Sequence, residues 1–119
     1  MKPRVLVVDD EPIVRKFIEA ALGRHGYQVR LASCVAEAEQ VFGQGRGGID
    51  LLLTEAELPD GSGVALTAGL RGWQGGLPVV YMSGQASVET QEKVLRKPFT
   101  TDALLSALLP SCCQHPKAA

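Results

Sequence analysis

Hydrophobic and polar residues alternate along the chain in blocks that predict five strands. Nearly uninterrupted aliphatic runs at residues 5–8, 49–54 and 78–82 predict strands covered on both faces, which is typical of parallel sheets. Residues 27–32 alternate between apolar and polar instead, which predicts a strand near a sheet edge. Residues 93–96 predict a brief fifth strand.

The segments between these strands have helical spacing. Apolar residues recur every three or four positions in residues 13–25, and Gly26 supplies a left-handed stop. Ser33 and Thr100 are expected to cap the second and last helices, and Pro110 is expected to end the last one. Residues 64–70 predict a short helix.

This alternation predicts an α/β fold of the flavodoxin-like, doubly wound type, with a five-stranded parallel sheet in the order 2-1-3-4-5. The fourth and fifth strands are joined by residues 83–92, whereas a crossover with its helix needs about 10–12 residues or more. We therefore expect the fourth helix to be reduced or absent. Residues 1–110 are predicted to form one domain and residues 111–119 a tail.

Composition excludes several classes of function. The net charge of −1 gives no basic field for nucleic acid, and no apolar run approaches the about 20 residues of a membrane span. Three cysteines give no disulfide framework, and Cys112, Cys113 and His115 match no standard zinc pattern. The sequence thus predicts a cytoplasmic protein that contacts neither nucleic acid nor membrane.

Polar side chains follow four of the predicted strands at one edge of the sheet. Asp9 and Asp10 follow the first strand, Glu55 the third, Ser83 the fourth and Lys97 the fifth. Parallel strands gather their carboxyl ends at one crevice, so these groups are expected to meet. Carboxylates suit Mg²⁺, and a lysine suits an anionic oxygen. The alternative role for Asp10 and Glu11 is to cap the helix that starts at Pro12.

The chain resembles the receiver domain of bacterial two-component response regulators. The motifs are LVVDDEP at 6–12, DLLL at 50–53 with Pro59 and Gly63, MSG at 82–84 and KPF at 97–99. The resemblance implies a domain that takes a phosphoryl group from a sensor histidine kinase onto an aspartate, and not a free-standing enzyme. It implies that Mg²⁺ is held by Asp9, Asp10, the acceptor carboxylate and the Glu57 backbone carbonyl. Ser83 and Lys97 would bind phosphoryl oxygens.

The acceptor position departs from the family pattern, because Glu55 occupies it in place of aspartate. The longer side chain displaces the reacting oxygen by more than an ångström, and such a misplacement costs about a hundredfold in rate. Glu55 either imitates a phosphorylated state or fills the site by pairing with Lys97, and the sequence leaves both open. Val94 stands where the family usually has a switching aromatic.

These features predict an atypical receiver that works through contacts with a sensor histidine kinase or another signalling protein. Two alternatives are a working Mg²⁺-dependent phosphoacceptor and, less favoured by the motifs, a Mg²⁺-dependent phosphoryl hydrolase. Loss of the fourth helix is expected to expose apolar surface on the fourth and fifth strands and the last helix, at Leu104, Leu105, Leu108 and Leu109. A homodimer through that face is therefore a further expectation.

Overall fold

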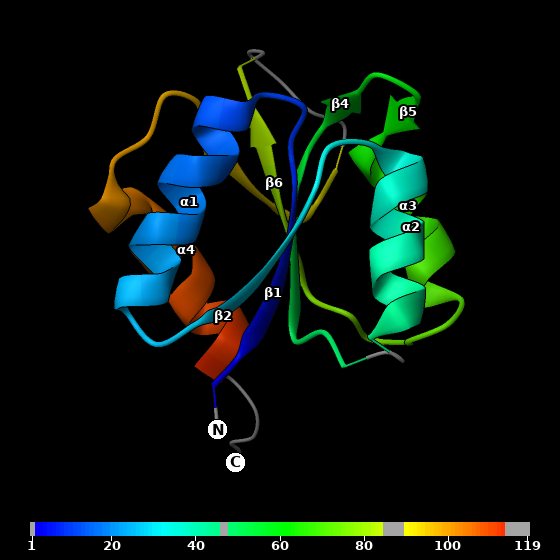
Figure 1. Cartoon of the computed structure of the whole chain (residues 1–119), viewed down its shortest axis with the longest axis horizontal. Coiled ribbons are helices and arrows are strands. Elements are labelled where there is room, and N and C mark those ends of the chain that lie inside the picture. The colour runs from blue at the N-terminus through cyan, green and yellow to red at the C-terminus, as the bar shows by residue number, and fades with distance from the viewer. Residues whose placement is uncertain (1, 46–47, 85–89, 114–119) are drawn as a thin grey trace.

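A computed structural model describes residues 2–45, 48–84 and 90–113, with side chains as far as residue 108. Its central sheet has five parallel strands: β1 (Arg4–Val8), β2 (Gln28–Ala32), β3 (Leu51–Glu55), β6 (Val79–Ser83) and β7 (Lys93–Arg96). They lie in the order β2-β1-β3-β6-β7 (Figure 1). Because β6 and β7 are the fourth and fifth strands of this sheet, the predicted order 2-1-3-4-5 is confirmed.

Helices cover both faces of the sheet. In Figure 1, α1 (Pro12–Arg24) and α4 (Thr101–Cys113) lie on one side, and α2 (Val35–Gln44) and α3 (Gly63–Arg71) lie on the other. Strand β1 supplies both resulting cores: Val5 and Val7 pack with α1 and α4, while Leu6 and Val8 pack with α2 and α3. All four side chains are fully buried, as the apolar run predicted. No described helix could span a membrane.

A small hairpin follows β3 and holds the edge of the sheet in place. Its strands are β4 (Glu57–Leu58) and β5 (Gly61–Ser62), which pair antiparallel. Gly63 comes next and lies so close to β3 that a Cβ there would clash with the Glu55 carbonyl oxygen. Its amide donates to the Ala56 carbonyl at 2.8 Å. Only glycine fits this approach, which fixes the backbone around Glu55.

Two helix ends differ from the prediction. Ser33 does not cap α2, because its hydroxyl and amide both donate to the Glu37 carboxylate. The first amides of α2, on Val35 and Ala36, instead donate to Asp60 from the hairpin, at 2.8 and 3.0 Å. This long-range cap ties the hairpin to α2. Thr100 caps α4 as predicted, with its hydroxyl accepting from Ala103 at 3.0 Å.

The last helix runs beyond its predicted end. Helix α4 continues to Cys113, so the prediction that Pro110 ends it is wrong. Proline costs a helix one hydrogen bond and some steric strain, but it does not forbid helical torsion angles. The predicted start of the tail at residue 111 therefore falls inside this helix, and the division into a domain and a tail stays a prediction.

The connection between β6 and β7 contains no helix in its described part, which comprises Gly84 and residues 90–92. Residues 85–89 lie outside the described residues. The apolar exposure predicted beside it is wrong for Leu104 and Leu108, since both are fully buried in the core under α1 and α4. Leu105 is half-buried, and the side chain of Leu109 lies outside the described residues.

Candidate functional site

The carboxyl ends of the strands bring four of the predicted site residues to one edge of the sheet. Asp9 follows β1, Glu55 ends β3, Ser83 ends β6 and Lys97 follows β7. The pairing of β6 with β7 continues one step beyond the strands, because the Lys97 amide donates to the Ser83 carbonyl at 2.9 Å. Lys97 therefore enters the site from a fixed backbone position.

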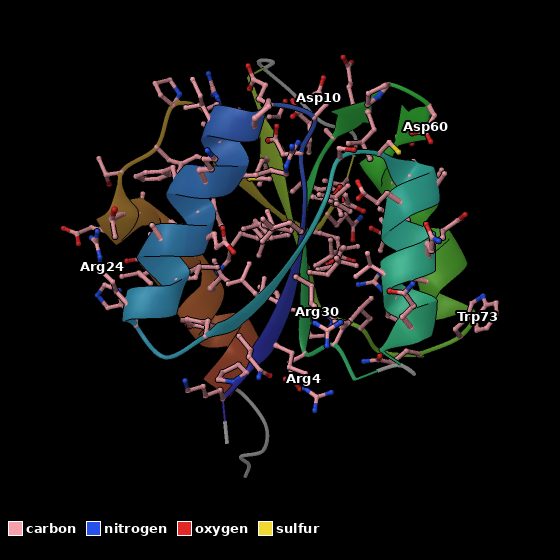
Figure 2. The ribbon with its side chains drawn as sticks, viewed as in Figure 1. Arg4, Asp10, Arg24, Arg30, Asp60 and Trp73 are labelled. Carbon is pink, nitrogen blue, oxygen red and sulfur yellow. The ribbon has the colours of Figure 1, made fainter. Side chains whose placement is uncertain are left out.

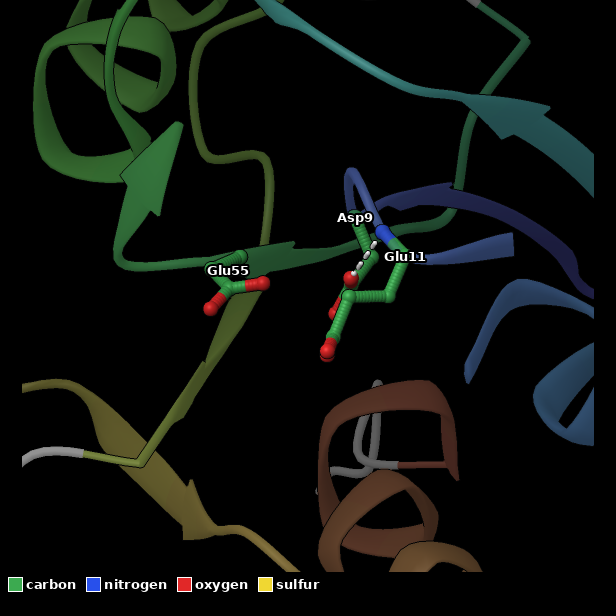
Figure 3. A group of neighbouring side chains, drawn as sticks. All are labelled: Asp9, Glu11 and Glu55. Atoms are coloured by element: carbon green, nitrogen blue, oxygen red, sulfur yellow. Dashed lines mark hydrogen bonds between the residues drawn. The ribbon is translucent and has the colours of Figure 1, made fainter. Parts of the chain in front are cut away.

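Asp9 is the most constrained acid of the site. Its side chain is fully buried, and its Oδ1 accepts a hydrogen bond from the Glu11 amide at 2.9 Å (dashed line in Figure 3). Its backbone is also held, because its amide donates to the Ala32 carbonyl at 3.1 Å and its carbonyl accepts from Arg15 at 2.7 Å. These contacts hold Oδ2 toward the space between β1 and β3.

The ammonium of Lys97 occupies that space. Its Nζ lies 2.7 Å from Asp9 Oδ2, 2.9 Å from Glu55 Oε1 and 3.2 Å from Glu11 Oε1. The three carboxylates surround one centre (Figure 3), and one oxygen from each lies within 4.8 Å of the others. The lysine side chain is 14% exposed and that of Asp9 is 0% exposed, so solvent screens their ion pair weakly.

Burial and neighbouring charge perturb both partners of this cluster. Desolvation, followed by the hydrogen bond and charge of Asp9, raises the pKa of Glu55 to about 7, although Lys97 opposes the shift. Desolvation alone would lower the pKa of Lys97. The hydrogen bonds that its ammonium donates to Asp9 and Glu55, together with the negative charges of both carboxylates, outweigh desolvation and raise that pKa above its usual value. Lys97 is therefore a permanent cation, while Glu55 changes charge near neutral pH.

The structure groups the acids differently from the sequence prediction. Asp9 and Glu55 come together as expected, but the third acid is Glu11 and not Asp10. Asp10 is exposed at the molecular edge (Figure 2), and Glu57 presents an exposed side chain in β4. Capping was the alternative role for Asp10 and Glu11, and the Glu11 side chain makes no cap hydrogen bond to α1. Ser83 is buried at the end of β6.

The sequence feature that could have identified Glu11 as a site residue is its position in the acidic run, two residues after Asp9. The chain turns after β1, where the Glu11 amide donates to Asp9 Oδ1, and the carboxylates of Asp9 and Glu11 lie in the same group. Nothing in the spacing of residue types distinguished this turn from one in which Asp10 points inward. The helix start at Pro12 was correct, and only the side-chain direction was missed.

The donor atoms of the cluster are of the type that binds Mg²⁺. All three are carboxylate oxygens, the ligands that Mg²⁺ prefers, and opposite ligands of Mg²⁺ lie about 4.2 Å apart. One oxygen from each of the three carboxylates lies within 4.8 Å of the others, so small side-chain movements would bring them to this spacing. Residues Asp9 and Glu55, with Glu11, would hold the ion only where Lys97 gives way, since its ammonium shares the same oxygens.

An apolar cavity of about 460 Å³ opens beside the charged cluster. Its walls come from the first turns of α1 and from the loop after β7, and they comprise Ile13, Val14, Phe17, Pro98 and Phe99, with Glu11 and Lys97 at one side. Ile13 is 82% exposed and Phe17 is 40% exposed. The Phe17 and Phe99 rings meet at a centroid distance of 6.0 Å. The charged site thus borders an exposed hydrophobic surface.

Known proteins resemble the chain over most of its length. The response regulator receiver domain family matches residues 5–109. The response regulator protein PilR of Pseudomonas aeruginosa is 35% identical over 80% of this chain, and the sensor histidine kinase RcsC of Salmonella typhi is 34% identical over 87%. The chain spans only 21% and 12% of the length of these two relatives.

Solved structures agree in fold. The receiver domain of the hybrid histidine kinase CckA superposes with a TM-score of 0.82 at 32% identity, covering 92% of this chain and 98% of that one. A response regulator receiver protein from Sinorhizobium medicae gives a TM-score of 0.86 at 26% identity, covering 97% and 98%. The sheet order, the acids at its carboxyl edge and these matches together show that the chain belongs to the response regulator receiver domain family.

Proposed function

We propose that this chain is an atypical receiver, which signals through protein contacts while Glu55 and Lys97 hold its acidic site in one state. The observation that carries the proposal is the position of the Lys97 ammonium, within 3.2 Å of three carboxylates. A cation of this chain thus already neutralises the oxygens that a metal and a phosphoryl group would need. The Lys97 ammonium thus takes the position between the carboxylates.

The chemistry of Glu55 supports the same reading. A phosphoacceptor must present a free carboxylate oxygen in line with its donor, and a misplacement of 1 Å can cost about a hundredfold in rate. Glu55 places its carboxylate one methylene further out and binds Lys97 through Oε1 at 2.9 Å. With its pKa raised to about 7, it is also partly protonated at neutral pH and so is a poorer nucleophile.

We propose that Asp9 and Glu55, together with Glu11, bind Mg²⁺ weakly. The family resemblance adds Asp10 and the Glu57 backbone carbonyl as proposed ligands, and the exposed Asp10 side chain would have to turn inward to take part. When bound, Mg²⁺ supplies positive charge against a transferring phosphoryl group. In this chain Lys97 competes for Asp9 and Glu55, so binding requires the lysine side chain to leave. Ser83 and Lys97 remain the residues proposed to contact phosphoryl oxygens if Glu55 is phosphorylated.

The proposed partner is a sensor histidine kinase or another cytoplasmic signalling protein. The apolar cavity beside the site supports this, because a partner that covers Ile13 and Phe17 would also contact Glu11 and Lys97. Exposed apolar surface of this kind commonly marks an interface. Contact there would report the state of the charged cluster directly. A homodimer through β6, β7 and α4 is a second proposal, supported by the open edge of β7, the last strand of the sheet.

Incubation with acetyl phosphate and Mg²⁺, followed by intact mass, tests the proposal. We expect no phosphoryl adduct on the parent chain and an adduct on Glu55→Asp, because the shorter side chain frees the acceptor from Lys97. An adduct on the parent would establish the phosphoacceptor alternative instead. Steady release of inorganic phosphate by the parent would establish the hydrolase alternative.

Imitation of a phosphorylated state and simple filling of the site share the Glu55 contact with Lys97. They differ in what removal of the charge does to partner binding. Glu55→Gln keeps the shape of the side chain, and a folded Gln variant that loses partner binding would support imitation. Unchanged binding would support filling.

A further inference from the structure

A small cleft lies between α2 and α3, away from the acidic site. Its volume is about 230 Å³, and its lining comprises Glu39, Phe42, Gly43, Gly69, Leu70 and Trp73. Phe42 and Leu70 form the floor and are each 3% exposed. A Cβ at Gly43 or Gly69 would meet nothing within 4 Å, so the two helix backbones leave the cleft open.

Trp73 forms the rim and is 82% exposed. Figure 2 shows it at the side of the molecule by the lower ends of α2 and α3, whereas Asp10 lies at the upper edge. Its amide is fixed by a 2.9 Å hydrogen bond to the Leu70 carbonyl, which anchors the loop after α3. Tryptophan is among the residues enriched at binding hot spots, where it becomes buried by the partner.

The surroundings of the cleft favour a cation. Four of the lining residues, Phe42, Gly43, Gly69 and Leu70, belong to the last turns of α2 and α3, where each macrodipole places about half a negative charge. The last turn of α2 contains no basic residue. The last turn of α3 contains Arg71, but its guanidinium binds the Leu77 carbonyl and the Glu92 carboxylate at 3.0 Å each.

Two side chains add to the negative electrostatic potential of the cleft. Glu39 is exposed and has no ion-pair partner within residues 2–45, 48–84 and 90–108, so its carboxylate is available at the cleft. The Trp73 indole offers an aromatic face, which attracts cations. A carboxylate, an aromatic face and two helix C-termini therefore converge on one apolar recess.

We propose that this cleft binds one arginine side chain of a partner protein. The aliphatic stem would lie on Phe42 and Leu70, and the guanidinium would lie between Glu39 and Trp73. Arginine suits the site better than lysine because its guanidinium is planar, weakly hydrated and stacks on aromatic rings. A whole small molecule fits less well, since such sites occupy about 300–1,000 Å³. This inference is independent of the function proposed for the acidic site.

N-acetyl-arginine amide tests the proposal in ¹H–¹⁵N NMR on the intact chain. We expect saturable shifts of the Trp73 indole and of the Gly43 and Gly69 amides, with an affinity near the millimolar range for a single side chain. The citrulline analogue has the same shape without the charge, and it should produce little shift. Trp73 is the only tryptophan, so its indole signal is unambiguous.

Substitution of Glu39 provides a second test of the proposal. Glu39→Gln should weaken arginine binding by about two- to fivefold, as expected for one exposed ion pair. The matched control is Glu19→Gln, which removes an equally exposed helical glutamate on α1 and should leave the affinity unchanged. Both variants change solvent-exposed positions and should remain folded.

Two results would overturn the proposal. The first is equal shifts from the arginine and citrulline compounds, or none from either. The second is equal loss of affinity in Glu39→Gln and Glu19→Gln.

Discussion

Replacing Lys97 with methionine should destabilise the protein and create a metal requirement. Methionine keeps the length and most of the volume of the side chain but removes the cation from among Asp9, Glu11 and Glu55. At an effective dielectric constant of about 20, the 2.7 Å contact with Asp9 corresponds to about 6 kcal/mol of attraction, before desolvation is subtracted. Two ionised carboxylates within 4.8 Å of each other repel by at least about 3.5 kcal/mol on the same scale.

The net effect is smaller than these gross terms. Breaking a buried ion pair typically costs about 3–5 kcal/mol. The lower end applies here, because the Glu11 side chain is 61% exposed and Glu55, with its pKa raised to about 7, can take up a proton when the lysine is absent. We expect Lys97→Met to lower the free energy of unfolding by about 3 kcal/mol, which corresponds to about 10 °C in Tm for a chain of this size.

Mg²⁺ should then restore stability to the variant. At a tenfold excess over its Kd, a ligand specific for the folded state adds about 1.4 kcal/mol. Thermal denaturation with and without millimolar Mg²⁺ measures the effect, and the control is Lys16→Met, which removes an exposed lysine on α1. The reasoning is refuted if Lys97→Met is as stable as the parent, or if Mg²⁺ raises the Tm of both proteins equally.

Three further predictions follow from particular contacts. Because the pKa of Glu55 is raised to about 7, the folded state holds a proton that the unfolded state has lost, and the free energy of unfolding falls as pH rises toward and through 7. Between pH 5 and 8 the free energy of unfolding should fall by about 1–2 kcal/mol more in the parent than in Glu55→Gln, after the effect is reduced for the partial exposure of Glu55. Denaturant titrations across this pH range measure it, and parallel pH dependences of the two proteins would contradict it. Asp60→Ala should lower the Tm by a few degrees at pH 7, and the difference from the parent should vanish in acid. The reason is that hydrogen bonds from the Val35 and Ala36 amides hold the pKa of Asp60 below its usual value. A difference in Tm that does not change with pH would contradict this prediction. If the β7 and α4 face self-associates, light scattering should give a dimer for the parent chain and a monomer for Leu105→Glu, and a monomeric parent at high concentration would exclude that dimer.

The sheet and its order followed from the sequence because burial leaves a pattern in residue types. The aliphatic run from Val5 to Val8 suits a strand covered on both faces of a parallel sheet, and the structure buries all four side chains. The same reasoning placed Asp9, Glu55, Ser83 and Lys97 at one edge, since each follows directly on a strand. Strand direction alone determines that result.

The side-chain geometry of the site did not follow from the sequence. The spacing of the acids does not show whether Asp10 or Glu11 joins Asp9, and in the structure it is Glu11, whose amide also donates to Asp9 Oδ1. The cap on α2 comes from Asp60, which lies 25 residues away from Val35, whereas capping rules consider only neighbours in sequence. Leu104 and Leu108 are not exposed, because both pack in the core against α1 and the sheet.

The ammonium signal of Lys97 in ¹H–¹⁵N NMR, followed during a Mg²⁺ titration, tests the central claim most directly. An ammonium held by Asp9 and Glu55 exchanges its protons slowly and gives a signal that exposed lysines do not. We predict that this signal is present without metal and persists unchanged into millimolar Mg²⁺. Absence of the signal, or its loss at micromolar Mg²⁺ with matching shifts at Asp9 and Glu55, would show that the site belongs to the metal and not to Lys97.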